Sequence, residues 1–233
     1  MRVFLLSAGY GKRLLPLTKN TPKCLIKFNK KPLLQIWLEN LKEYGFGPFL
    51  INTHYLSNKV RRFIDNSKFK KEVSLTYERK LLGTAGSLIK NINFFKNNDA
   101  LILHADNYSE ENFSNFLKKH NSRPKNCLLT MMTHKTKNPQ TCGIVKVNSK
   151  NIMTDFKEKP KKYIGNLANC ATYLISNKYL IKLKKKNYSD FSTEIIPKLK
   201  NKIFTFETKK IFIDIGSPTN YKKIQKYLQN KSR

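Results

Sequence analysis

Ser7-Ala-Gly-Tyr-Gly-Lys-Arg-Leu-Leu-Pro-Leu-Thr18 follows directly on the apolar stretch Val3-Phe-Leu-Leu6 and leads into Thr21-Pro-Lys-Cys-Leu25. The apolar stretch predicts a buried β-strand, which the chain leaves through glycines at positions 9 and 11. Without two Cβ atoms, backbone N–H groups can close on an anion, and Lys12, Arg13 and Lys23 add positive charge. The segment therefore predicts a phosphate-binding loop, against the simpler alternative of an ordinary strand-to-helix turn.

Two well-known phosphate motifs do not fit the spacing of this loop. A P-loop requires Gly-Lys-Ser/Thr five residues after a first glycine, whereas Gly11-Lys12 is followed by Arg13. A dinucleotide fingerprint requires a third glycine at position 14, which is Leu14. The loop must therefore be interpreted together with the rest of the chain.

The composition predicts a folded protein rather than a disordered or membrane-spanning one. The chain has 233 residues, of which 39% are hydrophobic and 12% aromatic, enough for one sizeable domain with a core. No apolar run approaches the ~20 residues of a membrane helix, and the N-terminus has no cationic leader. We expect a single domain over residues 1–233 in the cytoplasm, without contact with a membrane.

The formal net charge of +31 is the most unusual property of the composition. Such a charge is typical of proteins that bind nucleic acid, and a basic nucleic-acid-binding module is a second interpretation of the chain. However, the basic residues are spread along the whole sequence, lysine greatly outnumbers arginine, and no aromatic-basic RNA-binding signature is found. We therefore expect a solvated lysine-rich surface without a specific nucleic-acid partner.

The cysteines and histidines lack the spacing of metal ligands. Cys24, Cys127, Cys142 and Cys170 include no C-x-x-C pair, and the four histidines include no H-E-x-x-H. We expect the cysteines to be reduced and mostly buried.

Strand-like and helix-like segments alternate, which predicts an α/β fold with a Rossmann-like, mixed and mostly parallel sheet flanked by helices. Expected strands include Val3–Leu6, 49–51, 73–77, 100–104 and 211–214, with 127–133, 143–147, 152–157, 171–175 and 203–206 in the strand-rich second half. One helix is expected to open at Pro32, a second to be capped by Ser57, and a third to start at Gly86. Further helices are expected near residues 110–120, 177–185, 190–200 and 218–228.

Two aspartates, Asp106 and Asp214, each follow an apolar strand. Because open α/β sheets bind ligands at the carboxyl ends of their strands, both carboxylates can reach the same edge. Taken alone, Asp106 could equally be a helix cap or a turn residue.

Several motifs together resemble the sugar-1-phosphate nucleotidyltransferases. Leu6–Thr18 with Pro22-Lys23 is similar to the family signature G-x-G-x-R-[LM]-x-P-L-T-x-x-x-P-K. Further similar segments follow in the same order: Leu82-Gly-Thr-Ala-Gly86, Asp106, Phe156-Lys-Glu-Lys-Pro160, Asn166-Leu-Ala-Asn169 and Phe212-Ile-Asp-Ile-Gly-Ser-Pro218. The chain departs from the family pattern at Ala105, where glycine is usual, and at Cys170-Ala171, where Ala-Gly is commoner.

The resemblance implies a role for each motif. Arg13 and Lys23 would be catalytic, and Asp106 and Asp214 would hold Mg²⁺. The implied nucleotide-binding residues are Ser7, Ala8, Gly9, Gly11, Lys12, Arg13, Gly83, Thr84 and Asp106, and the implied sugar-phosphate-binding residues are Lys23, Gly143, Glu158, Lys159 and Asn169. Taken separately, Leu82–Gly86 could be a helix-entry turn, Glu158-Lys159 a solvent-facing turn and Gly143 a strand bulge.

The resemblance also implies a fold and a reaction. The fold would be of the nucleotide-diphospho-sugar transferase type without a left-handed β-helix tail, with residues 1–110 forming a nucleotide half and 111–233 a sugar-phosphate half. The activity would be of EC 2.7.7 type, in nucleotide-sugar and polysaccharide biosynthesis. The short mannose- or heptose-1-phosphate guanylyltransferases are the most similar members, which favours GTP as the nucleotide. The alternative is a uridylyl-, cytidylyl- or thymidylyltransferase that acts on another phosphate acceptor. The sequence leaves the oligomeric state open between monomer and dimer.

Overall fold

The computed structural model describes residues 1–231, which form two compact units. Unit 1 comprises Met1–Arg2, Leu82–Leu103 and Glu111–Lys209, and unit 2 comprises Val3–Leu81, His104–Glu110 and residues 210–231. The prediction of a single domain stays a prediction. No helix in the described part of the chain is both long and apolar enough to cross a membrane.

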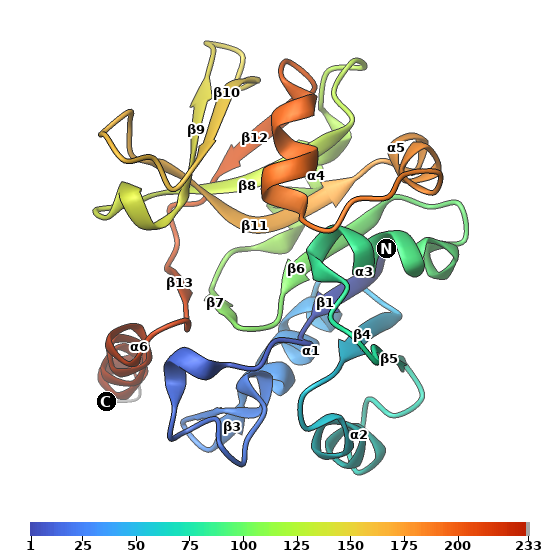
Figure 1. Cartoon of the computed structure of the whole chain (residues 1–233), viewed down its shortest axis with the longest axis vertical. Coiled ribbons are helices and arrows are strands. Elements are labelled where there is room, and N and C mark those ends of the chain that lie inside the picture. The colour runs from blue at the N-terminus through green and yellow to red at the C-terminus, as the bar shows by residue number, and fades with distance from the viewer. Residues whose placement is uncertain (232–233) are drawn as a thin grey trace. The chain divides into compact units, whose positions relative to one another are not determined.

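Unit 2 contains a parallel sheet of the strands β1 (Arg2–Leu6), β4 (Phe49–Thr53) and β5 (Val73–Tyr77). The strands lie side by side in Figure 1, with Val3 opposite Phe49 and Leu50 opposite Ser74. The helices of this unit are α1 (Leu33–Glu43), α2 (Ser57–Asp65) and α6 (Pro218–Lys231). Leucines and Trp37 recur at helical spacing on the buried face of α1, so this helix contributes a continuous apolar stripe to the core of unit 2.

Two short ribbons complete unit 2. One pairs β2 (Lys27–Phe28) with β3 (Lys31–Pro32), and the other pairs β7 (Asn107–Ser109) with β13 (Phe212–Asp214) in antiparallel register. The Trp37 indole N–H donates to the Asn107 carbonyl at 2.7 Å, which fixes β7 against α1. Single turns of 3-10 helix occur at Lys12–Leu14 and Lys23–Leu25.

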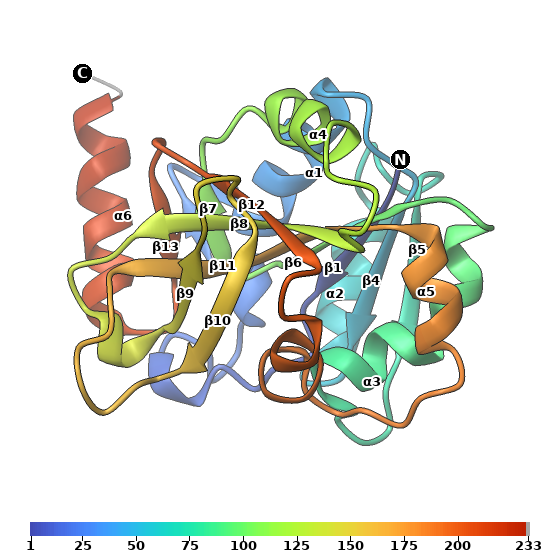
Figure 2. The same ribbon diagram turned by 90° about the horizontal axis from the view of Figure 1, so that it is seen from above.

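Unit 1 contains a mixed sheet built around the long strand β11 (Leu167–Ile175), which pairs antiparallel with β6 (Ala100–His104), β8 (Leu129–Lys135) and β9 (Gly143–Val147). Antiparallel to β9 runs β10 (Met153–Glu158), and parallel to β8 runs β12 (Ile203–Glu207). The helices are α3 (Gly83–Lys90), α4 (Phe113–Asn121) and α5 (Asn177–Leu183), and α4 lies over β8 and β12 in Figure 2. One-turn helical segments cover Ile92–Phe95, Pro139–Thr141, Phe191–Ile195 and Ile196–Leu199.

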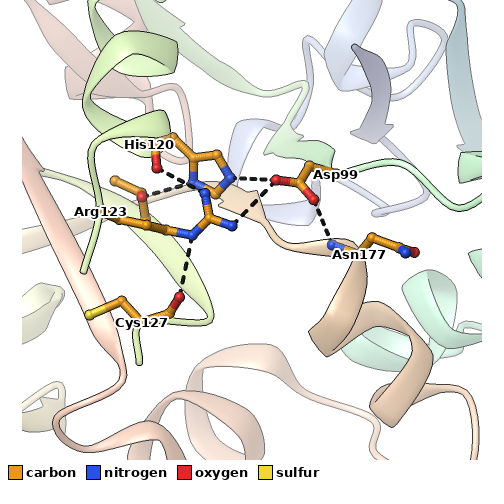
Figure 3. A network of polar contacts seen from close by, with 6 residues as sticks. Asp99, His120, Arg123, Cys127 and Asn177 are labelled. Carbon is orange, nitrogen blue, oxygen red and sulfur yellow. Dashed lines mark hydrogen bonds and ion pairs between the residues drawn. The ribbon is translucent and has the colours of Figure 1, made fainter. Parts of the chain in front are cut away.

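A buried polar network joins several elements of unit 1 (Figure 3). His120, at the end of α4, is fully buried and shares hydrogen bonds with Thr130 of β8 at 2.8 Å and with Asp99 at 3.0 Å. Asp99 also accepts the N–H of Asn177, the first residue of α5, at 2.7 Å. Arg123 donates to the His120 carbonyl at 2.8 Å and to the Cys127 carbonyl at 3.3 Å. The charge of Asp99 is tolerated in this network because both of its carboxylate oxygens accept hydrogen bonds.

The predicted fold class is confirmed, while some element boundaries are wrong. The strands Val73–Tyr77, Ala100–His104 and Gly143–Val147 were predicted with their observed limits. Ser57 does not cap α2, because the cap position is Leu56, in a left-handed conformation with φ 50° and no side-chain hydrogen bond. The start of α3 was placed at Gly86 but lies at Gly83, whose positive φ of 74° allows the chain to turn into the helix. Pro32 ends β3 and is also the N-cap residue of α1, so the helix opens at Pro32 as predicted, with Leu33 as its first helical residue.

Candidate functional site

The glycine loop after β1 has a defined conformation in unit 2. Gly11 has a φ of 68°, and a Cβ at this position would lie 2.9 Å from the Thr18 methyl carbon. The Thr18 hydroxyl donates to the Gly11 carbonyl at 2.9 Å, which closes the loop over the 3-10 turn that carries Arg13. Gly9, in contrast, is exposed and has open space around its Cα. The loop therefore requires glycine at position 11 for its own folding, whereas no contact within the described chain requires it at position 9.

The beginning of the loop is held by side chains on the adjacent strand. Ser7 donates its N–H to the Asn52 side-chain oxygen at 2.7 Å and its hydroxyl to the Asn52 carbonyl at 2.6 Å. The Asn52 amide in turn donates to the buried carboxylate of Glu78 at 2.8 Å. Asn52 and Glu78 thus fix the direction in which Ser7 and Ala8 leave β1.

The two predicted metal ligands, Asp106 and Asp214, lie close together in unit 2. Their approach follows from the β7–β13 ribbon, in which Asp214 pairs with Asn107 and the Ile215 N–H donates to the Asp106 carbonyl at 3.0 Å. The Ala105 N–H donates to the Leu6 carbonyl at 2.9 Å, which brings this ribbon to the end of β1. The aspartates therefore meet because β13 pairs with β7, and not because both follow strands of the parallel sheet.

Lys23 joins the two carboxylates. Its ammonium forms an ion pair with Asp106 and lies 3.6 Å from a carboxylate oxygen of Asp214. The Lys23 side chain is 12% exposed, compared with 30% for Asp106 and 49% for Asp214. The lysine is therefore largely withdrawn from solvent, while Asp214 has the more accessible of the two carboxylates.

Burial and neighbouring charge shift the pKa values of these carboxylates in opposite directions. Burial would raise the pKa of Asp106, but the charges of Lys23 and His104 outweigh it and lower that pKa below its ordinary value. Burial and the charge of Asp106 raise the pKa of Asp214, against the opposing effect of Lys23 and Arg13. Because ionisation of Asp214 beside Asp106 is unfavourable, a further cation near the two carboxylates would be stabilised.

Arg13 and Lys12 add two more cations to this part of unit 2. A Cβ on Gly216 would lie 2.6 Å from a guanidinium nitrogen of Arg13 and 2.6 Å from a carboxylate oxygen of Asp214. Both groups therefore lie against the backbone of Gly216, which must be a residue without a side chain. The Lys12 ammonium lies over the ring of the exposed Tyr10, 5.3 Å from its centroid. Three of the predicted phosphate-binding side chains, those of Lys12, Arg13 and Lys23, thus belong to one unit.

The other predicted residues, all in unit 1, begin with the turn into α3. A Cβ on Gly83 would overlap the Ser189 carbonyl oxygen and lie 2.9 Å from the Ser189 carbonyl carbon. The same carbonyl accepts the N–H of Ala85 at 2.9 Å. The Thr84 hydroxyl accepts the Phe191 N–H at 2.8 Å and lies 3.4 Å from the Asp190 carboxylate. Gly83 and Thr84 therefore connect α3 to residues 189–191, a structural role that the sequence did not predict.

Glu158 and Gly143 face each other at the ends of β10 and β9. They are paired in register, and a Cβ on Gly143 would lie 2.6 Å from a carboxylate oxygen of Glu158 and 2.5 Å from the Phe156 ring. The absence of a side chain at position 143 thus leaves room for the carboxylate. Burial and the charge of Asp190 raise the pKa of Glu158, although Lys159 opposes them. Lys159 itself has an exposed side chain, and its N–H donates to the Cys142 carbonyl at 3.0 Å.

Asn169 lies on β11, and both polar atoms of its side-chain amide form hydrogen bonds with residues of the same strand. The amide nitrogen donates to the Tyr173 hydroxyl at 2.6 Å, and the amide oxygen accepts the Ala171 N–H at 2.9 Å. Ala171 has a φ of 49°, at the position where the pairing of β11 with β8 is irregular. The Tyr173 ring lies 4.6 Å from the Phe191 ring, measured between centroids.

The structure thus divides the predicted residues into two clusters. The cluster of unit 2 comprises Ser7, Ala8, Gly9, Gly11, Lys12, Arg13, Lys23, Asp106 and Asp214. The cluster of unit 1 comprises Gly83, Thr84, Gly143, Glu158, Lys159 and Asn169. Within the latter, Thr84 is connected to Asn169 through Phe191 and Tyr173, which the sequence did not single out as site residues, and Thr84 also contacts Asp190. The helix-cap pattern Asp190-x-x-Thr193-Glu194 was the available signal for Asp190, whose carboxylate accepts the Thr193 N–H at 2.8 Å.

The donor set of unit 2 fits a hard divalent cation. Asp106 and Asp214 offer two carboxylates, the ligands that Mg²⁺ prefers, with Arg13 and Lys23 available for phosphate oxygens. Over residues 1–231, no three His, Cys, Asp or Glu side chains form a group that could hold a metal by themselves. A cation here would therefore require further ligands from water or from a bound phosphate.

Comparison with known proteins gives relatives over the whole chain. The mannose-1-phosphate guanyltransferase 2 of Candida glabrata is 30% identical, with 100% of this chain and 66% of the relative covered. The mannose-1-phosphate guanylyltransferase catalytic subunit beta of Drosophila melanogaster is 26% identical over 94% of this chain and 60% of the relative. The chain thus spans slightly less than two thirds of the length of these relatives.

Solved structures share the fold. The HddC protein of Yersinia pseudotuberculosis, complexed with GMP-PN, superposes with a TM-score of 0.81 and 21% identity, covering 97% of this chain and 98% of that protein. A UDP-glucose pyrophosphorylase complexed with UDP-glucose also has a TM-score of 0.81, with 19% identity over 99% of this chain and 98% of that protein. Residues 2–231 match the family described as nucleotidyl transferase, and this match over nearly the full length shows that the chain belongs to that family.

Proposed function

We propose that this protein transfers a nucleoside monophosphate from a nucleoside triphosphate to a sugar 1-phosphate, releasing pyrophosphate and a nucleoside diphosphate sugar. A sugar-phosphate oxygen would attack the α-phosphorus in line with the departing pyrophosphate. That oxygen is already anionic near neutral pH, so the reaction needs no strong general base. It needs groups that bring two polyanions together and neutralise the charge on the transferring phosphoryl group.

The convergence of Arg13, Lys23, Asp106 and Asp214 in unit 2 carries this proposal. Arg13 and Lys23 would bind the triphosphate, assisted by Lys12 and by backbone N–H groups of Ser7, Ala8, Gly9 and Gly11. Asp106 and Asp214 would hold Mg²⁺, which would neutralise phosphate charge when bound. Lys23, which forms an ion pair with Asp106 and lies near Asp214, would contact the phosphates near the reacting centre.

In unit 1, Glu158 and Asn169 would hydrogen-bond the sugar hydroxyls, with Lys159 on the acceptor phosphate and Gly143 allowing close approach to the backbone. Gly83 and Thr84 would contact the nucleotide through their backbone, since the Thr84 hydroxyl is already engaged with Phe191. The raised pKa of Glu158 is compatible with a carboxyl that is shielded from water and hydrogen-bonded to a neutral sugar.

GTP is the favoured nucleotide in this proposal, because both curated relatives described above are named as mannose-1-phosphate guanylyl- or guanyltransferases. A matrix of four nucleoside triphosphates against a panel of sugar 1-phosphates, assayed by pyrophosphate release, tests the nucleotide and the acceptor together. Turnover with GTP above that with UTP, CTP and dTTP is expected. A preference for UTP or dTTP would replace the guanylyl assignment with a uridylyl or thymidylyl one.

The metal ligands are tested by charge-neutral substitutions. Asp106→Asn and Asp214→Asn are expected to abolish Mg²⁺-dependent pyrophosphate release while the circular dichroism spectrum stays that of the wild type. Asp65→Asn, at an exposed position of α2 in the same unit, removes the same charge and is the matched control. Near-normal turnover in both site variants would refute the two-carboxylate site.

A nucleic-acid-binding module is the second interpretation, supported by the net charge of +31 alone. Binding to arbitrary duplex DNA, measured across a salt titration, separates the two functions. Weak binding beside measurable nucleotidyl transfer supports the enzyme. Tight, salt-sensitive binding without transfer would favour the binding module.

A further inference from the structure

Two of the four cysteines lie on facing segments of unit 1. The strands β9 and β11 pair antiparallel through Ile144 and Ala168. Extending this pair by two residues along each strand brings Cys142 near Cys170, which lies just before the irregular part of β11 at Ala171. Cys142 is also near enough to contribute to the raised pKa of the Cys170 thiol. Cys142 immediately precedes β9 and is itself extended, with φ −125° and ψ 161°, so the strand direction continues through it.

Opposite positions of this kind have a spacing that a disulfide can bridge. Facing Cα atoms of antiparallel strands lie about 4.5–5.5 Å apart. Disulfides are formed between Cα atoms about 4.4–6.8 Å apart. The Lys159 N–H, donated to the Cys142 carbonyl at 3.0 Å, continues the pairing of β10 with β9 and holds Cys142 in line from its other side.

The two thiols differ in accessibility and in their neighbours. Cys142 is partly exposed, whereas Cys24, Cys127 and Cys170 are buried. The Cys170 sulfur lies 3.3 Å from Nδ1 of His134, on the neighbouring strand β8. Burial and the proximity of Cys142 raise the pKa of the Cys170 thiol, which keeps it protonated, and burial lowers the pKa of His134 to about 4, which keeps the imidazole neutral.

We propose that Cys142 and Cys170 form a reversible intramolecular disulfide when the protein is exposed to a peroxide. Cys142 is the thiol that reacts with the peroxide, and Cys170 is the resolving thiol. The Cys142 thiolate attacks one peroxide oxygen and displaces hydroxide, which takes up the proton that the Cys142 thiol had released to solvent, giving a sulfenic acid and a first water. The Cys170 sulfur then attacks the Cys142 sulfur and displaces hydroxide, which takes up the Cys170 proton and leaves as a second water. Two electrons move from the two sulfurs to the peroxide, and a dithiol reductant returns them.

A metal site is the competing interpretation of cysteines beside a histidine. In the part of the chain that the structure describes, no group of three His, Cys, Asp or Glu side chains is arranged to hold a metal ion. Since Cys142, Cys170 and His134 form no such group, the two thiols are better suited to oxidation than to metal binding.

The disulfide would join the segment before β9 to β11, within the cluster of unit 1. Gly143 follows Cys142, and Asn169 precedes Cys170. On the proposed function, which this consequence assumes, oxidation would change KM for the sugar 1-phosphate more than KM for the nucleotide. The test of the disulfide itself does not depend on any activity, so the two proposals can fail separately.

The experiment treats the purified full-length chain with hydrogen peroxide, blocks the remaining thiols, and maps peptides by mass spectrometry without reduction. A cross-linked pair of peptides containing Cys142 and Cys170, lost on treatment with dithiothreitol, is expected. A Cys24→Ser/Cys127→Ser double variant keeps only the proposed pair and should form the same cross-link. Cys142→Ser and Cys170→Ser should each abolish it.

Thiol labelling gives a second measurement, which can be interpreted without detecting a cross-link. In the untreated native protein, one thiol is expected to react rapidly with iodoacetamide, and Cys142→Ser should remove this rapid reaction. Peroxide-treated protein in which Cys142 is carried to sulfinic acid while Cys170 still alkylates after unfolding would overturn the proposal. Cross-links between Cys142 and any other cysteine, within or between chains, would do the same.

Discussion

The turn into α3 provides a stability prediction that can be worked out from the geometry of one glycine. Gly83→Ala places a methyl group where φ is 74°, which costs ~1–2 kcal/mol for a residue with a Cβ. The new carbon would also overlap the Ser189 carbonyl, which accepts the Ala85 N–H at 2.9 Å and the Gly86 N–H at 3.4 Å. Moving that carbonyl weakens a hydrogen bond worth ~1 kcal/mol and adds packing strain of ~1–3 kcal/mol.

The free energy of unfolding is therefore expected to fall by about 4 kcal/mol in Gly83→Ala. For a chain of this size, 1 kcal/mol corresponds to ~2–4 °C in Tm, so the melting temperature should fall by about 8–16 °C. Thermal unfolding followed by circular dichroism at 222 nm measures this shift.

Gly45→Ala is the matched control for the backbone strain. Gly45 has the same φ of 74°, but a Cβ there would have no atom within 4 Å. The control should lose only the conformational contribution, about 1–2 kcal/mol, or ~2–8 °C in Tm. If Gly83→Ala melts no lower than Gly45→Ala, the Ser189 carbonyl does not restrict position 83 and the reasoning fails.

Three further perturbations test other parts of the molecule. Arg13→Ala should lower nucleotidyl transfer by ~10³, because cations that clamp a transferring phosphoryl group commonly contribute that much, whereas Arg61→Ala on the exposed side of α2 should leave the rate unchanged; equal rates in the two variants would make the loop structural. Burial raises the pKa of Glu39, but hydrogen bonds from Gln35, Lys31 and Lys68 outweigh it and lower the pKa to about 2, so these contacts stabilise the fold above the ordinary carboxyl pKa and are lost as pH falls toward 2. Glu39→Gln should therefore cost ~1 kcal/mol at pH 7, since both lysines are largely exposed, and nothing at pH 2; a cost independent of pH in urea unfolding would contradict this. Burial lowers the pKa of His134 from its ordinary 6.5 to about 4, so the unfolded chain binds the proton more readily and stability should fall as pH decreases from 6.5 to 4; His134→Gln should flatten this slope, and an unchanged slope would assign it to other groups.

The sequence predicted the strands best where a short apolar run lay between turn residues. Ala100–His104 was placed with its observed limits because its apolar run is buried in the strand, whereas Val73–Tyr77 was placed with its observed limits although none of its residues is buried. The start of α3 was missed because the positive φ of Gly83 depends on the Ser189 carbonyl, more than a hundred residues away. Local propensity contains no information on such a contact.

The candidate site shows the same division. The charged residues Arg13, Lys23 and the two aspartates could be identified from the sequence because their chemistry is specific. The β7–β13 ribbon that brings the aspartates together was not foreseen, since three-residue strands have almost no pattern of their own. Asn52 and Glu78 were likewise not identifiable as supports, because the hydrogen bond between them spans 26 residues.

The Asp99 network has a consequence for how unit 1 opens. At seven residues, α5 is too short to persist as an isolated helix. Its first N–H, on Asn177, is held by a carboxylate that also binds a histidine on α4, and that histidine binds a threonine on β8 (Figure 3). The Asn177 amide should then exchange with solvent deuterium only when α4 separates from the sheet, as slowly as the central amides of β8. A helix end that would ordinarily fray thus reports on the cooperative opening of the whole unit.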